Sequence, residues 1–99
     1  MDPMKEEEML RKITSHFGIE TQLMKFIEEV GEFQNECYKR HFVDPTAGNV
    51  EDEAADVLVL FSQLLLYFNV DLDKVGEIFD QKVERTVERI DKNWYDKHR

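Results

Sequence analysis

Residues that break helices are scarce in this chain and occur at only a few places. There are 4 glycines and 2 prolines among 99 residues, so long helices joined by short connections are the expected architecture. Turn residues interrupt the helical periodicity at Gly18, in the segment 41–48 and in the segment 69–71. The sequence therefore predicts an all-α protein of four helices.

Apolar residues recur every three or four positions along four stretches, which is the spacing of one helix face. The predicted helices cover about Lys5–Phe17, Glu20–Arg40, Val50–Phe68 and Leu72–Tyr95. Asn49, with Asp52 three residues later, resembles a helix cap, and Asp71 is placed to cap the last helix. A chain of this length has room for one core, so we expect residues 1–99 to form a single domain.

The third predicted helix changes character at Asp56. The residues before Asp56 are mostly acidic, whereas the segment 57–68 is apolar on nearly every side. A helix of that kind must be covered all round, and three further helices from so short a chain cannot cover it. The β-branched run 57–61 also fits a buried strand, but the sequence offers no second strand to pair with it. We therefore expect a four-helix bundle completed by oligomerisation.

Two acidic pairs stand out, Glu29 with Glu32 in the second predicted helix and Glu53 with Asp56 in the third. A spacing of three residues puts both carboxylates on one helix face, roughly 5–6 Å apart at Cβ. Such neighbours repel each other unless a cation or a proton relieves the repulsion. If the two helices pack antiparallel, four carboxylates meet in an oxygen cage of the kind that Mg²⁺ accepts. Glu28, four residues before Glu32, is a further candidate to face this site.

A solvent-exposed acidic face is the simpler interpretation of either cluster alone. Acidic residues favour the first turn of a helix because of the helix dipole, and the segment 51–53 fits that description. The segment 28–32 also fits an exposed face. Asp56 is different because it lies inside a helix, where an acidic residue has no capping role. Asp56 therefore favours the metal site.

A basic stripe follows one face of the last predicted helix. Its members are spaced by three, four and three residues, and they are Lys82, Arg85, Arg89 and Lys92. Such a stripe suits phosphate oxygens, but it also suits a solvated face supported by a pair between Glu88 and Lys92. We expect the solvated face for Arg89 and Lys92. Both interpretations stay open for Lys82 and Arg85.

The bulk properties exclude several classes of function. A net charge of -9 offers no attraction for a nucleic acid polymer. The single cysteine, Cys37, permits neither an intrachain disulfide nor a cysteine-based zinc site, and we expect it to be a core thiol. The N-terminus lacks the apolar stretch of a signal peptide, and the segment 57–68 is shorter than the roughly 20 residues that span a membrane. We expect a cytoplasmic protein without a membrane segment.

The motif Glu28-Glu29-x-x-Glu32, a gap of twenty residues and the motif Glu53-x-x-Asp56 resemble the signature of MazG-like all-α nucleoside triphosphate pyrophosphohydrolases. The flanking residues agree with this resemblance, which covers about residues 15–92. Gln22 and Lys25 precede the first motif, a Val-Leu-Val-Leu run follows the second, and a basic helix closes the chain.

The resemblance implies hydrolysis of the α–β phosphoanhydride of an NTP or dNTP, which releases a nucleoside monophosphate and pyrophosphate. It implies a Mg²⁺ site, in which Mn²⁺ substitutes, with the ligands Glu29, Glu32, Glu53 and Asp56. The cation would neutralise the triphosphate and lower the pKa of the attacking water. Glu28 would either support the residues that bind the cation or help to orient that water. It further implies that phosphates are held by Lys25, Lys82 and Arg85.

Members of this family form dimers or tetramers, so the resemblance also implies a homodimer or homotetramer. The residues do not identify the base or the sugar of the substrate. Aromatic side chains that are candidates to stack on a base, although a place in the core or its rim explains each more simply, are Phe17, Tyr38, Phe42 and Trp94. The alternative function is a non-catalytic acidic oligomerisation module, with or without a bound metal.

Overall fold

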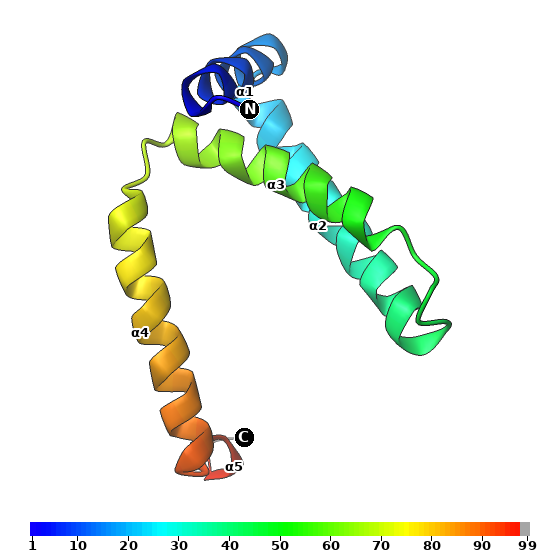
Figure 1. Ribbon diagram of the computed structural model, residues 1–99, viewed down its shortest axis with the longest axis vertical. Coiled ribbons are helices and arrows are strands. Elements are labelled where there is room, and N and C mark those ends of the chain that lie inside the picture. Colours follow the sequence, from blue (N-terminus) through cyan, green and yellow to red (C-terminus); the bar gives the residue numbers. More distant parts are fainter. Residues whose placement is uncertain (98–99) are drawn as a thin grey trace. The chain divides into compact units, whose positions relative to one another are not determined.

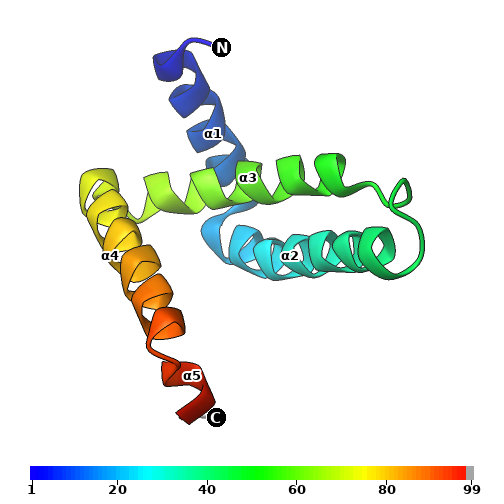
Figure 2. The ribbon, with the colours of Figure 1, turned by 60° about the horizontal axis from the view of Figure 1, so that its bottom comes forward.

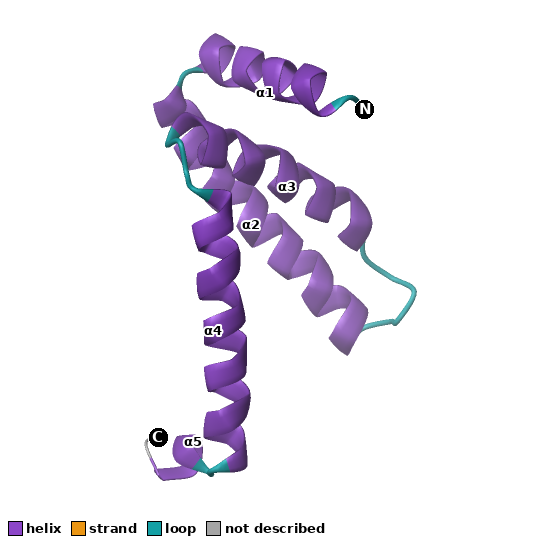
Figure 3. Ribbon diagram, turned by 60° about the vertical axis from the view of Figure 1, so that its left-hand side comes forward, coloured by secondary structure: helices purple, strands orange, loops and turns teal. Residues whose placement is uncertain are grey.

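The computed structural model describes residues 1–97, which form five helices and no strand. The helices are α1 (Pro3–Phe17), α2 (Ile19–Phe42), α3 (Val50–Tyr67), α4 (Leu72–Asp91) and α5 (Trp94–Lys97), labelled in Figure 1. The all-α prediction is confirmed. Figure 3 shows the short loops between the helices. None of the helices within residues 1–97 has both the length and the apolar character that crossing a membrane requires. The chain divides into two units, one with α1 to α3 and one that begins at Val70.

The first unit is a helical hairpin with a third helix packed on it. α1 ends where the sequence predicts, at Gly18, whose φ of 89° is a conformation that glycine adopts without strain. The Gly18 N–H donates to the Thr14 carbonyl at 2.8 Å. α2 and α3 run antiparallel and side by side, and α1 contacts both of them (Figure 2). This hairpin brings the two acidic segments of the sequence next to each other.

The interior of the first unit is unusually polar. Leu60 is the one apolar residue within residues 1–97 that is buried. The other buried residues are polar or charged, and they are Thr14, Gln22, Glu29 and Gln63. Phe26 and Phe61 stack between α2 and α3 with ring centroids 6.1 Å apart.

The apolar residues that recur at helical spacing in the second predicted helix, Leu23, Ile27 and Val30, do not face the interior of this chain. Leu23 and Val30 are exposed, and Ile27 is 74% exposed. Cys37, expected in the core, is half-buried. The face of α2 that turns inward instead carries Gln22 and Glu29. Much apolar surface therefore stays uncovered by the chain itself, and assembly with further subunits stays a prediction.

The second unit begins with a capped helix. The Asp71 carboxylate accepts a hydrogen bond from the Lys74 N–H at 3.1 Å, so the predicted cap of α4 is confirmed. The prediction that this helix continues to Tyr95 is wrong. α4 ends at Asp91 because Asn93 adopts a φ of 56°, a left-handed conformation that asparagine tolerates better than most residues. The chain then turns into α5, where the Arg89 guanidinium lies 4.5 Å from the centre of the Trp94 ring.

Candidate metal centre

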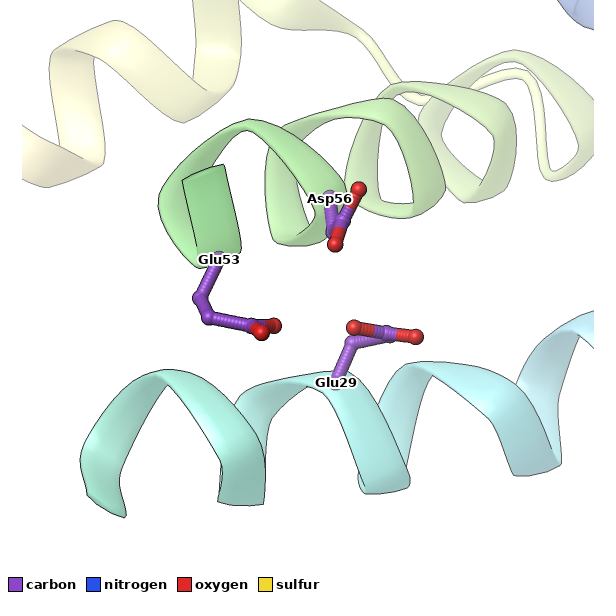
Figure 4. A group of neighbouring side chains, drawn as sticks. All are labelled: Glu29, Glu53 and Asp56. Atoms are coloured by element: carbon purple, nitrogen blue, oxygen red, sulfur yellow. The ribbon is translucent and has the colours of Figure 1, made fainter. Parts of the chain in front are cut away.

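Three carboxylates converge between α2 and α3. One oxygen from each of Glu29, Glu53 and Asp56 lies within 4.8 Å of the oxygens from the other two. Figure 4 shows Glu29 projecting from α2 toward Glu53 and Asp56, which project from α3. Glu29 is buried, Glu53 is half-buried and Asp56 is exposed, so the cluster extends from the interior of the hairpin to its surface.

These carboxylates lack the partners that would compensate their charge. Glu29 Oε2 and Glu53 Oε2 are buried and find no hydrogen-bond partner within residues 1–97. Burial raises the pKa of Glu53, and the neighbouring charges of Glu32, Asp56, Glu29 and Asp52 raise it further. Lys25 supplies one positive charge, with Nζ 3.6 Å from Glu29 Oε1. The cluster as a whole therefore remains short of positive charge.

The donor set fits a hard divalent cation. All its atoms are carboxylate oxygens, the ligands that Mg²⁺ prefers. The two buried oxygens without partners are the atoms that a cation would satisfy. Three carboxylates also leave coordination positions for water and for phosphate oxygens, as is usual at Mg²⁺ sites that bind nucleotides.

Glu28 and Glu32, the other acidic residues of the α2 motif, are exposed and lie outside the group of three. Glu32 is nevertheless close enough for its charge to be the second-largest cause of the raised pKa of Glu53. Glu28 is not among the causes of that pKa shift. The structure therefore places Glu32 beside the cluster and Glu28 on the solvent side of the helix.

The basic stripe lies on α4, in the second unit. Lys92 Nζ donates to Glu88 Oε1 at 2.6 Å, as expected for a solvated face. The Arg89 guanidinium lies over the face of the Trp94 ring. Lys82 and Arg85 form no ion pair within residues 1–97, and their relation to the acidic cluster stays a prediction.

A groove of ≈ 590 Å³ adjoins the cluster within the first unit. Glu29, Asp56 and Lys25 line its charged part. The remaining lining includes Gln22 and the apolar side chain of Leu60. This volume is within the usual range of small-molecule sites. A ligand in the groove would have carboxylates, one lysine and an apolar wall within reach.

The α2–α3 loop is held by Arg40, which the sequence interpretation did not single out. Its guanidinium donates to both carboxylate oxygens of Glu51, at 2.8 and 2.9 Å. It also donates to the carbonyls of Ala47 and Gly48, each at 3.2 Å. This pairing lowers the pKa of Glu51 to about 2. The signal in the sequence is an arginine and a glutamate on either side of a short loop, where Glu51 also fits a first-turn acidic residue.

Glu36 holds the same loop from α2. Its carboxylate accepts hydrogen bonds from the Asn49 N–H at 3.0 Å and from Lys39 Nζ at 3.1 Å. These two hydrogen bonds, the one from Asn49 first, are the main causes of the lowered pKa of Glu36. Gly48 has a φ of 87°, and a Cβ there would lie 2.7 Å from the Glu36 carbonyl oxygen. Asn49 is the N-cap residue of α3, as the sequence predicts, but its side chain makes no capping hydrogen bond to the backbone. Its amide donates to the Asp52 carboxylate at 3.4 Å instead.

No family model, curated protein or solved structure matches this chain. The relation to MazG-like enzymes stays a prediction from the acidic motifs at residues 28–32 and 53–56.

Proposed function

We propose that this protein is a Mg²⁺-dependent nucleoside triphosphate pyrophosphohydrolase, which cleaves the α–β phosphoanhydride of an NTP or dNTP. The observation that carries the proposal is the convergence of Glu29, Glu53 and Asp56, with two buried carboxylate oxygens that have no partner within residues 1–97. The groove beside them supplies room for a nucleotide. The acidic motifs that resemble the MazG-like signature give the substrate class and the bond.

The three converging carboxylates would hold Mg²⁺ or Mn²⁺. When bound, the cation supplies charge neutralisation for the phosphates and activation of a water. Lys25 lines the groove and lies next to Glu29, so its ammonium group is placed to contact a phosphate oxygen. Lys82 and Arg85 of α4 are proposed as further phosphate contacts from the resemblance to the MazG-like signature alone.

In the proposed reaction the oxygen of a water molecule forms a bond to phosphorus while the bridging α–β P–O bond breaks. The products are a nucleoside monophosphate and pyrophosphate. A proton must leave the water, and Glu32 is the best-placed acceptor because it is exposed and its charge reaches the cluster. A role for Glu28 in orienting that water rests on the resemblance alone, since Glu28 is exposed and is not among the charges that raise the pKa of Glu53.

We further propose a cytoplasmic homodimer or homotetramer with a MazG-like bundle. The exposed apolar side chains on α2, α3 and α4 support assembly, because large uncovered apolar surfaces mark interaction sites. Light scattering at micromolar concentration is expected to show a dimer or a tetramer. A monomer under those conditions would contradict the assembly.

The activity is tested with purified protein, Mg²⁺ and a panel of NTPs and dNTPs, with the products identified by ³¹P NMR. Monophosphate and pyrophosphate are the expected products. Orthophosphate as the first product would indicate a γ-phosphatase instead. Absence of turnover across the whole panel would favour the alternative, a non-catalytic oligomerisation module, which the uncovered apolar surface also fits.

A further inference from the structure

α4 carries an apolar face that is exposed along the whole helix. The helix runs without a break from Leu72 to Asp91 (Figure 1), and none of its residues is buried. At about 3.6 residues per turn, its apolar residues recur on one face. This face, the apolar stripe of α4, consists of the exposed residues Leu72, Val75, Phe79, Val83, Val87 and Ile90. A continuous apolar surface of this kind marks an interaction site.

The charged residues of α4 are separated onto the two sides of the apolar stripe. At about 100° per residue, the acidic residues lie about 80–160° from the centre of the stripe on one side, and the basic residues lie equally far away on the other side. The acidic side consists of Asp73, Glu77, Asp80, Glu84, Glu88 and Asp91. The basic side consists of Lys74, Lys82, Arg85 and Arg89. An acidic, an apolar and a basic face therefore lie next to one another on this helix.

This separation is unfavourable for the helix by itself. Like charges four residues apart repel each other, and Asp80 with Glu84 and Arg85 with Arg89 are such pairs. Within residues 1–97 the one ion pair of α4 joins Glu88 to the following cap residue Lys92, on the face opposite the apolar stripe. Opposite charges from outside the helix would relieve the repulsion on both sides.

A second copy of α4 supplies those opposite charges if it runs in the same direction. When two parallel helices face each other across a two-fold axis that runs between them, each acidic side lies beside the basic side of the partner. In an antiparallel pair the two-fold axis is perpendicular to the helices, so acidic meets acidic and basic meets basic. Like charges placed opposite each other disfavour that arrangement. The charge pattern therefore favours the parallel pair.

We propose that α4 is the contact surface between two copies of this protein, with the two apolar stripes packed against each other in parallel. Burial of the stripes drives the association, and the charges on both sides set its direction. The proposal names a face and a direction for the proposed homodimer or homotetramer, and it does not depend on nucleotide hydrolysis. In this pair Lys82 and Arg85 have carboxylates of the partner as neighbours, which is an alternative to the phosphate contacts that the resemblance implies.

Single cysteines at the two ends of the stripe test the direction. In a Cys37→Ser background, Leu72→Cys and Ile90→Cys place a thiol at each end, on the same line along the helix. In a parallel pair each thiol meets the same residue of the partner. Each variant alone should therefore form disulfide-linked dimers in air about 10-fold or more faster than Gln81→Cys, which lies on the opposite face. Non-reducing gel electrophoresis measures the rates, and circular dichroism checks that each variant is folded.

An antiparallel pair would place residue 72 beside residue 90 of the partner. A mixture of Leu72→Cys and Ile90→Cys would then form cross-links that neither variant forms alone, and the proposed direction would be wrong. Rates no faster than that of Gln81→Cys, alone and mixed, would mean that the stripe is covered by another part of the chain or by a different protein. That result would overturn the proposal.

Charge reversals test the complementarity of the two sides. Lys82→Glu with Arg89→Glu makes the neighbours of the stripe acidic on both sides, and Asp80→Lys with Glu84→Lys makes them basic on both sides. Each double variant should raise the dissociation constant of the pair by about 10-fold or more. An equimolar mixture of the two double variants should associate about as tightly as the wild type, because both edges again join opposite charges.

Lys5→Glu with Lys12→Glu is the matched control. It makes the same change in net charge as Lys82→Glu with Arg89→Glu, but at exposed positions of α1, and it should raise the dissociation constant by less than about 3-fold. Sedimentation equilibrium without nucleotide or metal measures each constant, so the result is independent of whether NTPs are hydrolysed. A monomeric wild type, charge reversals that leave the constant unchanged, or a mixture that does not restore association overturns the proposal.

Discussion

Carboxylates occur at the loop end and in the middle of the α2–α3 hairpin, but they are paired at the loop end and lack partners in the middle. At the loop end, Glu36 accepts from a backbone N–H and from Lys39, and Glu51 forms a bidentate pair with Arg40. The pKa values of both carboxyls are lowered there. In the middle, Glu29 and Glu53 each have a buried oxygen without a partner within residues 1–97, and the pKa of Glu53 is raised.

The difference separates carboxylates that hold the fold from carboxylates that are available to a ligand. A carboxyl whose pKa is lowered by folding stabilises the folded state at neutral pH, and one whose pKa is raised destabilises it. A fold that keeps unfavourable carboxylates together, next to a groove, is typical of a functional site. The predictions below test whether the two ends of the hairpin differ in this way.

The largest expected effect is on activity. Glu53→Gln or Asp56→Asn should lower kcat/KM by about 100-fold or more, because each removes a charged oxygen from the proposed cation site. The fold should stay intact, and the melting temperature should be equal or higher, since repulsion within the cluster decreases. Steady-state kinetics and thermal melts measure both effects.

Glu51→Gln is the matched control at the loop end. It removes one carboxylate charge two residues from Glu53, and it should lower the melting temperature while kcat/KM changes only a few-fold. Unchanged turnover in both Glu53→Gln and Asp56→Asn would mean that the metal binds elsewhere.

A glycine substitution tests the backbone conformation of the α2–α3 loop without changing its charge. Gly48→Ala should destabilise the protein by ~1–3 kcal/mol, because a side chain is strained at its positive φ and would approach the Glu36 carbonyl oxygen. Urea denaturation measures the change. Gly31→Ala is the control, since it lies within α2 with open space around it and should be neutral or stabilising by up to about 1 kcal/mol. Equal changes in the free energy of unfolding for Gly48→Ala and Gly31→Ala would contradict a close approach of residue 48 to the Glu36 carbonyl oxygen.

The pH dependence of stability should have opposite signs at the two places. The pKa of Glu51 falls on folding from 4.5 to about 2, so its contribution is complete above pH 4.5 and is lost as the pH falls toward 2. The pKa of Glu53 is raised on folding from its ordinary value of 4.5, so its unfavourable contribution is absent below pH 4.5 and grows as the pH rises above it.

Melting temperatures of three proteins, measured from pH 7 to pH 2 without metal, check these signs. Glu53→Gln should exceed the wild type at pH 7 and converge with it by about pH 4.5. Glu51→Gln should fall below the wild type at pH 7 and converge with it only near pH 2. If the melting temperatures of all three proteins changed with pH in parallel, Glu51 and Glu53 would not have pKa values shifted in opposite directions.

The smallest expected effect concerns Asn49. Its side chain makes no cap hydrogen bond to the backbone of α3, and its backbone N–H rather than its side chain contacts Glu36. Asn49→Ala should therefore change the free energy of unfolding by less than about 0.5 kcal/mol. A loss of about 1 kcal/mol, typical of a removed N-cap, would show that the side chain caps α3 after all.

Local signals in the sequence predicted the helices well and their inward faces poorly. The helix ends at Gly18 and Asp71 follow from the chemistry of single residues, and both are confirmed. The inward face of α2 could not be predicted from apolar periodicity, because Gln22 and Glu29 occupy it while Ile27 is exposed. Which face of a helix packs inward depends on contacts with residues far away in the sequence.

In the candidate site, too, features set by local spacing could be predicted and features set by long-range packing could not. The spacing of Glu53 and Asp56 pointed to a shared face, and the short loop pointed to α2 as its partner, so the group of three could be predicted from the sequence. The position of Glu32 beside this group rather than in it could not be predicted, because it depends on the exact rotation of α2. The hydrogen bond between Gln22 and Gln63 depends on tertiary contacts, and its one signal in the sequence was the polar pair Ser62 and Gln63 within the otherwise apolar run 57–68.

Calorimetric titration with Mg²⁺ tests the central claim most directly, because it asks whether the carboxylates without partners bind a cation. We expect saturable binding to the wild-type protein and to Glu51→Gln, and loss of binding in Glu53→Gln and Asp56→Asn. No saturable binding to the wild type up to about 10 mM Mg²⁺, or equal binding to all four proteins, would contradict the account.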